Sequence, residues 1–284
     1  MAGVPRAEWK PELELHHAML WGSTLEQMIA AGQAGGYGSL VLRPYQLDVA
    51  RAAGRSKADI RAMLGDAGLT VHYIDGFPAG LPGSGSIEAK LKGSDVTEAQ
   101  VVDALEVLDA KYVNVPHYLG KRLPQAVLRD ALAGLCERLG REGRGVLVEF
   151  QPESGVASWL EAIDLARETG CSNIATTLDT VQLAHAGGSP EQLTADTAPW
   201  LGAIQVADKR GPIHFGRIPE AERFSRVQPG EGDLPLAELL RRVRQFRPGL
   251  AIGVEVFSKA LMALSPDEAA RQTADTTRAL IASL

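Results

Sequence analysis

Short apolar runs alternate with longer amphipathic segments along nearly the whole chain. The run Gly145–Phe150 (GVLVEF) is apolar at almost every position, which is typical of a parallel strand buried on both faces. The amphipathic segments show a different pattern. After the first predicted strand, Leu25, Met28 and Ile29 recur at the spacing that places them on one face of a helix. By the first pattern we predict eight strands: Glu12–His17, Ser39–Arg43, Thr70–Ile74, Lys111–Val115, Gly145–Phe150, Asn173–Asp179, Leu201–Ala207 and Leu250–Val256.

Helical patterns fill the intervals between the predicted strands. Gly65 and Gly68 mark the end of one helix, and Thr97 has the side chain expected of an N-cap in the next. We predict helices at Ser23–Gly35, Asp48–Ala67, Val96–Leu108, Gln125–Leu139, Val156–Glu168, Pro190–Leu193, Leu234–Gln245 and Pro266–Ser283.

The strict alternation of strand and helix predicts an α/β fold with parallel strands. Eight units in 284 residues predict closure into a single (β/α)8 TIM barrel, one domain spanning residues 1–284. An open doubly wound sheet is the alternative, and it would need a glycine-rich fingerprint directly after the first strand. The segment Gly35–Ser39 (GGYGS) follows the first helix instead, so it favours the barrel.

Two predicted connections are unusually long, Gly76–Ser94 and Lys209–Asp233. Both follow strands, so in a barrel both lie at the end where active sites are built. Long irregular loops at that end are typical of lids and binding loops.

Composition narrows the classes of partner. The net charge is −6 with both signs interspersed, so we expect no nucleic acid as a partner. No apolar run approaches the roughly 18 residues of a membrane span. The N-terminal segment lacks the apolar core of a signal peptide, and the two cysteines are isolated, so we expect a cytoplasmic protein. Exposed barrel helices often mediate pairing, which makes a homodimer the expected assembly.

Oxygen-bearing side chains stand at the C-terminal ends of four successive predicted strands. A charged side chain is costly there unless it is paired or bound to a metal, and three carboxylates without a cation would repel one another. An all-oxygen donor set favours one divalent ion such as Mn²⁺ or Mg²⁺, with Co²⁺ as a further candidate. A rim of salt bridges to Arg or Lys is the alternative. The four candidate metal ligands are Glu149, Asp179, Gln205 and Glu255.

The segments around these positions resemble the xylose isomerase-like TIM barrels, a family that includes ketohexose 3-epimerases and 3-dehydroshikimate dehydratases. The resemblance rests on five segments in order: VEFQPESG (148–155), LDTVQLAHAGG (178–188), IQVAD (204–208), RVQPGEGDLP (226–235) and GVEVFS (253–258). It implies that the four candidates are the metal ligands. The family commonly has His where this chain has Gln205 and Gln182, which leaves the substrate open. The chain also lacks the additional His ligands of the family's endonuclease IV members.

The resemblance implies chemistry by proton removal next to a carbonyl, with the metal stabilising an enediolate. We therefore expect an isomerase or epimerase acting on a small polyhydroxylated ketone or keto acid, with Glu149 and Glu255 as both ligands and acid/base groups. A dehydratase of the 3-dehydroshikimate type is one alternative, and a barrel that binds a small molecule without catalysis is another.

Further residues are candidates for contact with the substrate. Gln151 shares the inward face of Glu149, and Lys209 shares that of Gln205, because side chains alternate along a strand. Gln182 and Arg226 are candidates through the family resemblance. His117 follows the fourth strand and is a candidate base.

The other histidines near strand ends are weaker candidates. His16 and His17 are adjacent, so on a continuous strand at most one would face the interior. His185 follows the sixth strand, where we expect it to cap a helix or face solvent.

Overall fold

Eight parallel strands form one sheet in the order β2-β1-β8-β7-β6-β5-β4-β3 in this computed structural model, which describes residues 9–84 and 96–284. Isolated bridges from Ser39 to Thr70 and from Leu42 to Ile74 join the two ends of that order, so the ring closes. The predicted (β/α)8 barrel is confirmed. The strands are β1 (Leu13–His16), β2 (Ser39–Val41), β3 (Tyr73–Ile74), β4 (Tyr112–Pro116), β5 (Gly145–Glu149), β6 (Ile174–Asp179), β7 (Leu201–Val206) and β8 (Ile252–Val254).

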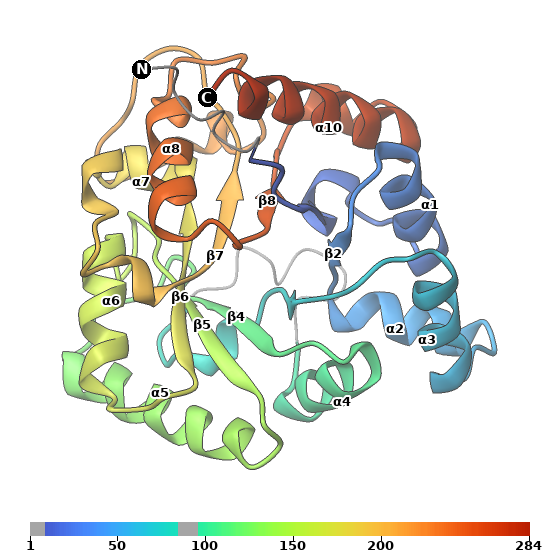
Figure 1. The fold of residues 1–284 in the computed structure, drawn as a ribbon. Coiled ribbons are helices and arrows are strands. Elements are labelled where there is room, and N and C mark those ends of the chain that lie inside the picture. Colours follow the sequence, from blue (N-terminus) through green and yellow to red (C-terminus); the bar gives the residue numbers. More distant parts are fainter. Residues whose placement is uncertain (1–8, 85–95) are drawn as a thin grey trace, which may run out of the picture.

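Helices surround the strands, and the last helix, α10, lies against the first, α1 (Figure 1). Thr24, Thr97 and Ser265 each cap a helix through a reciprocal capping box, which satisfies backbone N–H groups at its start. The helices are α1 (Leu25–Gly35), α2 (Pro44–Ala52), α3 (Lys57–Asp66), α4 (Glu98–Leu108), α5 (Gln125–Gly140), α6 (Trp159–Glu168), α7 (Thr180–His185), α8 (Leu236–Phe246), α9 (Lys259–Met262) and α10 (Pro266–Ala282).

The helix predicted over Asp48–Ala67 is two helices, α2 and α3. Gly54 adopts a left-handed conformation with φ of +88°, which ends the first helix. Ser56 then caps the second by accepting a hydrogen bond from the backbone N–H of Asp59. The spacing of apolar residues did not reveal the break, because α2 and α3 both bury apolar side chains at helical spacing.

The short helix α7 was not predicted, although it begins directly after β6. Asp179 ends the strand and caps the helix, since its Oδ1 accepts a hydrogen bond from the N–H of Gln182 at 2.8 Å. The helix expected at Pro190–Leu193 is only a 3₁₀ turn over Pro190–Gln192. Of the predicted lid at Gly76–Ser94, residues 85–94 lie outside the described residues.

The barrel interior is built in two layers along the strand direction. Its apolar layer is a small cluster separate from the main core between strands and helices: Val41, Tyr73, Leu147, Ala175 and Ala203. Side chains alternate along a strand, so the residue two positions further on faces the same way. At each of these strands that residue is polar: Arg43, Asp75, Glu149, Thr177 and Gln205. The apolar layer thus forms the floor of a polar chamber at the C-terminal end of the barrel.

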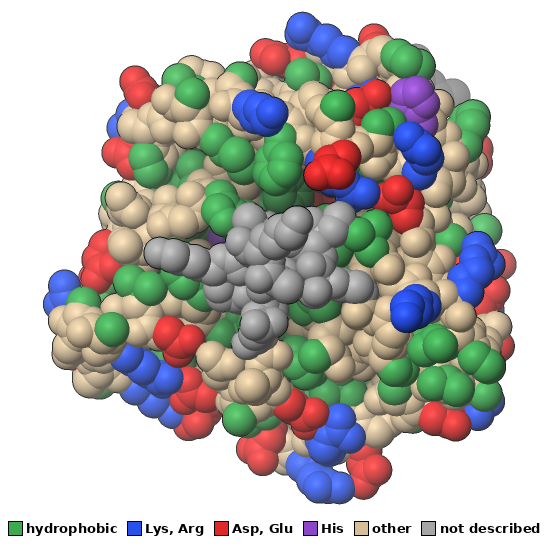
Figure 2. Space-filling view, turned by 180° about the vertical axis from the view of Figure 1, so that it is seen from behind, with side chains coloured by type: hydrophobic (Ala, Val, Ile, Leu, Met, Phe, Trp, Pro, Cys, Tyr) green, Lys and Arg blue, Asp and Glu red, His purple; other side chains and the backbone are tan. Residues whose placement is uncertain are grey.

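The outer surface carries mixed charge. On the face shown in Figure 2, basic side chains lie beside acidic ones and do not gather into one patch. Among the described residues, no helix has both the length and the apolar character needed to cross a membrane.

Gly253 in β8 allows β7 to approach closely. A Cβ atom at this position would lie 2.5 Å from the carbonyl oxygen of Ile204, and that backbone oxygen cannot rotate away. We therefore expect Gly253→Ala to lower the free energy of unfolding by about 1–3 kcal/mol, measured by chemical denaturation. As a control, Gly65→Ala in α3 meets no atom within 4 Å and should stabilise the protein by roughly 0.5–1 kcal/mol. Equal effects of the two substitutions would contradict this account of the packing.

Candidate functional site

The four predicted metal ligands meet in the polar chamber, each at most 5% exposed. Asp179 pairs with Gln205 in the register of β6 and β7, and Gln205 pairs with Gly253, two residues before Glu255. Glu149 closes the row at the end of β5. The structure therefore brings together all four of the residues that the sequence singled out.

The Glu149 carboxylate is held by amide groups. Its Oε2 accepts a hydrogen bond from Asn114 Nδ2 at 2.5 Å, and its Oε1 accepts one from Gln182 Nε2 at 2.6 Å. Gln151 Nε2 lies 3.4 Å from the same Oε1. Burial, with the charges of Asp75 and Asp179, nevertheless raises the pKa of Glu149 to about 8. The site thus disfavours the accumulation of negative charge unless a cation is present.

Arg226 supplies positive charge between two of the carboxylates. Its Nη1 donates to Asp179 Oδ2 at 2.7 Å and lies 3.3 Å from Glu255 Oε2. Burial raises the pKa of Glu255 well above its ordinary value against the opposing effect of Arg226, and Asp179 and Glu149 add to the rise. The alternative interpretation, a rim of salt bridges to Arg or Lys, therefore holds in part. The Arg226 guanidinium is, however, shared between two buried carboxyl groups.

The chemistry of the donor set fits a divalent cation. Gln205 Oε1 is buried and accepts no hydrogen bond from any described residue. Leaving such an acceptor unsatisfied costs about 1–3 kcal/mol, so it is suited to a ligand that the protein itself does not provide. Gln205 Nε2 faces the other way, 3.4 Å from His16 Nε2 and 3.5 Å from the Tyr73 hydroxyl. The amide orientation therefore leaves its oxygen available.

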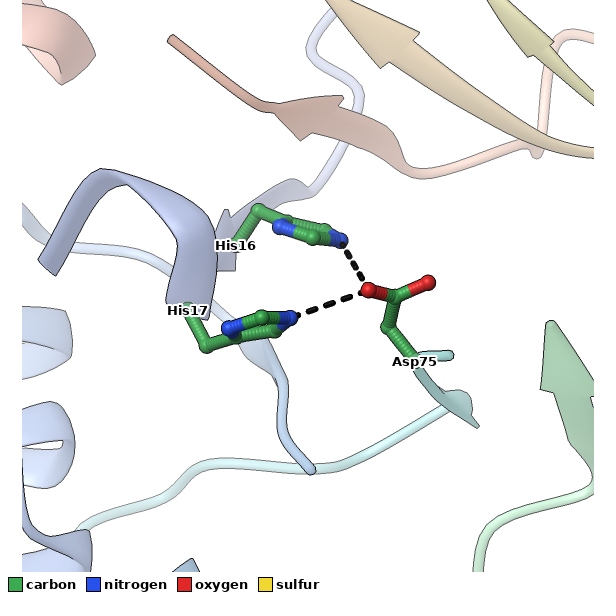
Figure 3. A group of neighbouring side chains, drawn as sticks. All are labelled: His16, His17 and Asp75. Carbon is green, nitrogen blue, oxygen red and sulfur yellow. Dashed lines mark hydrogen bonds and ion pairs between the residues drawn. The ribbon is translucent and has the colours of Figure 1, made fainter. Parts of the chain in front are cut away.

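A neighbouring group was missed from the sequence. His16 and His17 both point toward Asp75, which follows β3 (Figure 3). The expectation that only one of the two histidines could face inward was wrong, because β1 ends at His16 and a 3₁₀ turn begins at His17. Burial lowers the pKa of His16 well below its ordinary value. Asp75 carried the same signal as Glu149, an acidic side chain at the end of a predicted strand.

A cavity of about 260 Å³ opens above the chamber, slightly smaller than the range of roughly 300–1,000 Å³ for small-molecule sites. It is lined by Glu149 and Glu255 and by four of the five residues expected to contact a substrate: Gln151, Gln182, Lys209 and Arg226. Asp179 and Gln205 are buried in the chamber and are not among the residues that line this cavity.

His117 is a correction to the expected site. It is fully buried, but it does not line the cavity. Its Nε2 lies 3.2 Å from the carbonyl oxygen of Pro82, and its Nδ1 accepts a hydrogen bond from the N–H of Gly155 at 3.1 Å. Both ring nitrogens are thus used to join two loops, which removes His117 as a candidate base.

The loop Lys209–Asp233 covers one side of the cavity and is fastened by ion pairs. Lys209 Nζ lies 3.0 Å from a Glu222 carboxylate oxygen, and Arg223 Nη2 lies 2.6 Å from a Glu153 oxygen. His185, expected to cap a helix or face solvent, is instead buried against this loop, with its Nδ1 2.9 Å from the carbonyl oxygen of His214. The loop is therefore an ordered wall of the site.

Comparisons with known proteins agree with this architecture. Residues 30–280 match the sequence profile of the family described as "Xylose isomerase-like TIM barrel". A solved structure of the IolI protein with a bound zinc atom is 17% identical, with a TM-score of 0.80 over 96% of this chain and 98% of its own. The probable 3-DHS dehydratase AsbF from Bacillus anthracis is 13% identical, with a TM-score of 0.73 over 94% of this chain and 98% of its own.

A D-allulose 3-epimerase from Methylomonas sp. is 16% identical, with a TM-score of 0.69 over 95% of this chain and 98% of its own. At these identities the solved structures show a shared fold. No curated protein matches the sequence. The profile match covers most of the chain, and the chain belongs to the xylose isomerase-like TIM-barrel family.

Proposed function

We propose that this protein is a divalent-metal-dependent isomerase or epimerase that removes a proton next to the carbonyl of a small sugar-like hydroxy-ketone. The observation that carries the proposal is the chamber itself, in which three buried carboxyl groups and an unsatisfied amide oxygen converge below a small cavity. The family membership and the epimerase among the similar structures support the same class of reaction.

The charges that line the cavity favour an uncharged substrate. Its three cationic side chains are Lys209, Arg223 and Arg226, and each is already paired with a carboxylate of this chain. A phosphate or carboxylate would have to displace one of these partners at an energetic cost. A neutral polyhydroxylated ketone would instead find amide donors and acceptors on Gln151 and Gln182.

Glu149 and Glu255 are placed to act as the acid and base. They stand at the ends of β5 and β8, which are separated in the barrel by β6 and β7, so they reach a bound ketone from different sides. One carboxylate can remove a proton from the carbon next to the carbonyl, and the other can return a proton to the opposite face. Asn114 and Gln182 hold Glu149 in position for this role.

Glu149, Asp179, Gln205 and Glu255 would hold the metal. A divalent ion there would supply positive charge to stabilise the negative charge that develops on the substrate oxygens. The donors are all oxygen atoms, which favours Mn²⁺ or Mg²⁺. Arg226 also lines the cavity, where it can donate to a substrate oxygen.

The first prediction of this proposal concerns the two carboxylates. Glu149→Gln and Glu255→Gln keep the side-chain shape and remove the proton acceptor, so we expect each to reduce turnover by about 10²–10⁴-fold. The measurement is deuterium uptake from D₂O into ketohexoses and 3-dehydroshikimate, followed by NMR with Mn²⁺ present.

Glu14→Gln is the matched control, since Glu14 is a buried glutamate at the opposite end of the barrel and lines a different cavity. It should leave deuterium uptake unchanged. Full exchange in both site variants would refute the assigned roles. Loss of water from 3-dehydroshikimate, with no exchange in any ketose, would identify a dehydratase. Ligand binding without any exchange would identify a binding protein.

The second prediction concerns Arg226. Arg226→Met leaves Asp179 and Glu255 without their counter-charge, so the metal-free protein should lose about 3–5 kcal/mol of stability. A divalent cation that binds these carboxylates would restore the missing charge. Added Mn²⁺ should therefore raise the melting temperature of the variant more than that of the unaltered protein. An equal or smaller rise would argue against a metal at this position.

A further inference from the structure

A second group of ligand atoms lies at the same end of the barrel, apart from the four donors discussed above. His17 Nε2 lies 3.0 Å, and His16 Nε2 3.8 Å, from Asp75 Oδ2 (Figure 3). The three side chains offer ligand atoms that all lie within 4.8 Å of one another. Ligand atoms around a tetrahedral zinc, with bonds of about 2.0–2.1 Å, stand roughly 3.3 Å apart. The observed distances bracket that spacing.

Neighbouring side chains orient the group as a metal site requires. Asn114 Nδ2 donates to Asp75 Oδ1 at 2.7 Å, which leaves Oδ2 turned toward the two histidines. Glu255 Oε1 lies 3.2 Å from His16 Nδ1, the ring nitrogen that faces away from Asp75. A histidine ligand characteristically donates its other ring N–H to a carboxylate, and this contact has that arrangement.

The tautomer of His16 decides whether it can be a ligand. In the structure its Nδ1 accepts a hydrogen bond from the backbone N–H of Ala18 at 3.2 Å and also lies 3.2 Å from Glu255 Oε1. A neutral His16 must instead carry its proton on Nδ1 to leave a lone pair on Nε2. A cation at Nε2 would select the tautomer in which Nδ1–H donates to Glu255. The cation would also take the place of Gln205 Nε2, which lies 3.4 Å from His16 Nε2. Gln205 Nε2 could still donate to the Tyr73 hydroxyl.

We propose that His16, His17 and Asp75 bind a second divalent cation, of the Zn²⁺ or Co²⁺ type. Two imidazoles and one carboxylate differ from the all-oxygen set of the first site, and they favour ions of intermediate softness. Three protein ligands leave a coordination position open. Asp75 lines the cavity, so the proposed site adjoins the volume in which a small molecule would bind.

This inference does not rest on the proposed function, and the experiment separates the two. Metal-free protein is titrated with Co²⁺ alone, with binding followed by calorimetry and by the visible absorption of the bound ion. We expect two ions per chain for the unaltered protein and one for His17→Ala. Asp75→Asn should also bind one, and it retains an acceptor for Asn114. Asp179→Asn, which disables the first site and leaves the second group untouched, should bind one as well.

His72→Ala is the matched control, since His72 is a half-exposed histidine paired with Glu14 at the other end of the barrel. It should bind two ions. A single ion that both His17→Ala and Asp75→Asn retain would overturn the second site and leave the function proposal intact. A single ion retained by Asp179→Asn and lost in His17→Ala would support the second site and refute the first. Circular dichroism of each variant confirms that the fold is kept.

Discussion

The burial of several carboxyl groups at one end of a closed barrel is the constraint on which the rest of the site depends. Burial raises the pKa values of Glu149 and Glu255, and the charges of the neighbouring carboxylates Asp75 and Asp179 add to the rise. The guanidinium of Arg226 contacts both Asp179 and Glu255 and supplies positive charge between them. A barrel that needed only stability would gain by replacing such groups with apolar ones. Their presence is therefore an argument for binding a cation.

Amide side chains extend this electrostatic arrangement across the chamber. Asn114 donates to both Asp75 and Glu149, so it links the two proposed cation sites without adding charge. Thr177 donates to Asn114 Oδ1 at 2.8 Å and fixes the orientation of that amide. A change in the charge of one carboxylate is thus transmitted to the other through a shared hydrogen-bond donor.

The loop after β7 does more than cover the cavity. Asp208 organises its ends, because its carboxylate accepts hydrogen bonds from the backbone N–H groups of Lys209, Gly230 and Leu234. That framework carries Arg226 into the chamber, where the backbone N–H of Arg226 also donates to the carbonyl oxygen of Phe257. The position of the counter-charge for Asp179 and Glu255 is therefore set by a loop and not by a strand.

The sequence by itself determined the barrel and the row of donors at its C-terminal end. Strand–helix alternation predicts the closed sheet, and the two-residue period of a strand decides that Glu149, Asp179, Gln205 and Glu255 face one chamber. Only the tertiary structure decided that Arg226 enters this chamber, that His17 turns toward Asp75 and that His117 serves two loops. Local periodicity fixes the direction of a side chain within its own element. Contacts between loops and strands far apart in the chain depend on where the elements pack, which no local pattern specifies.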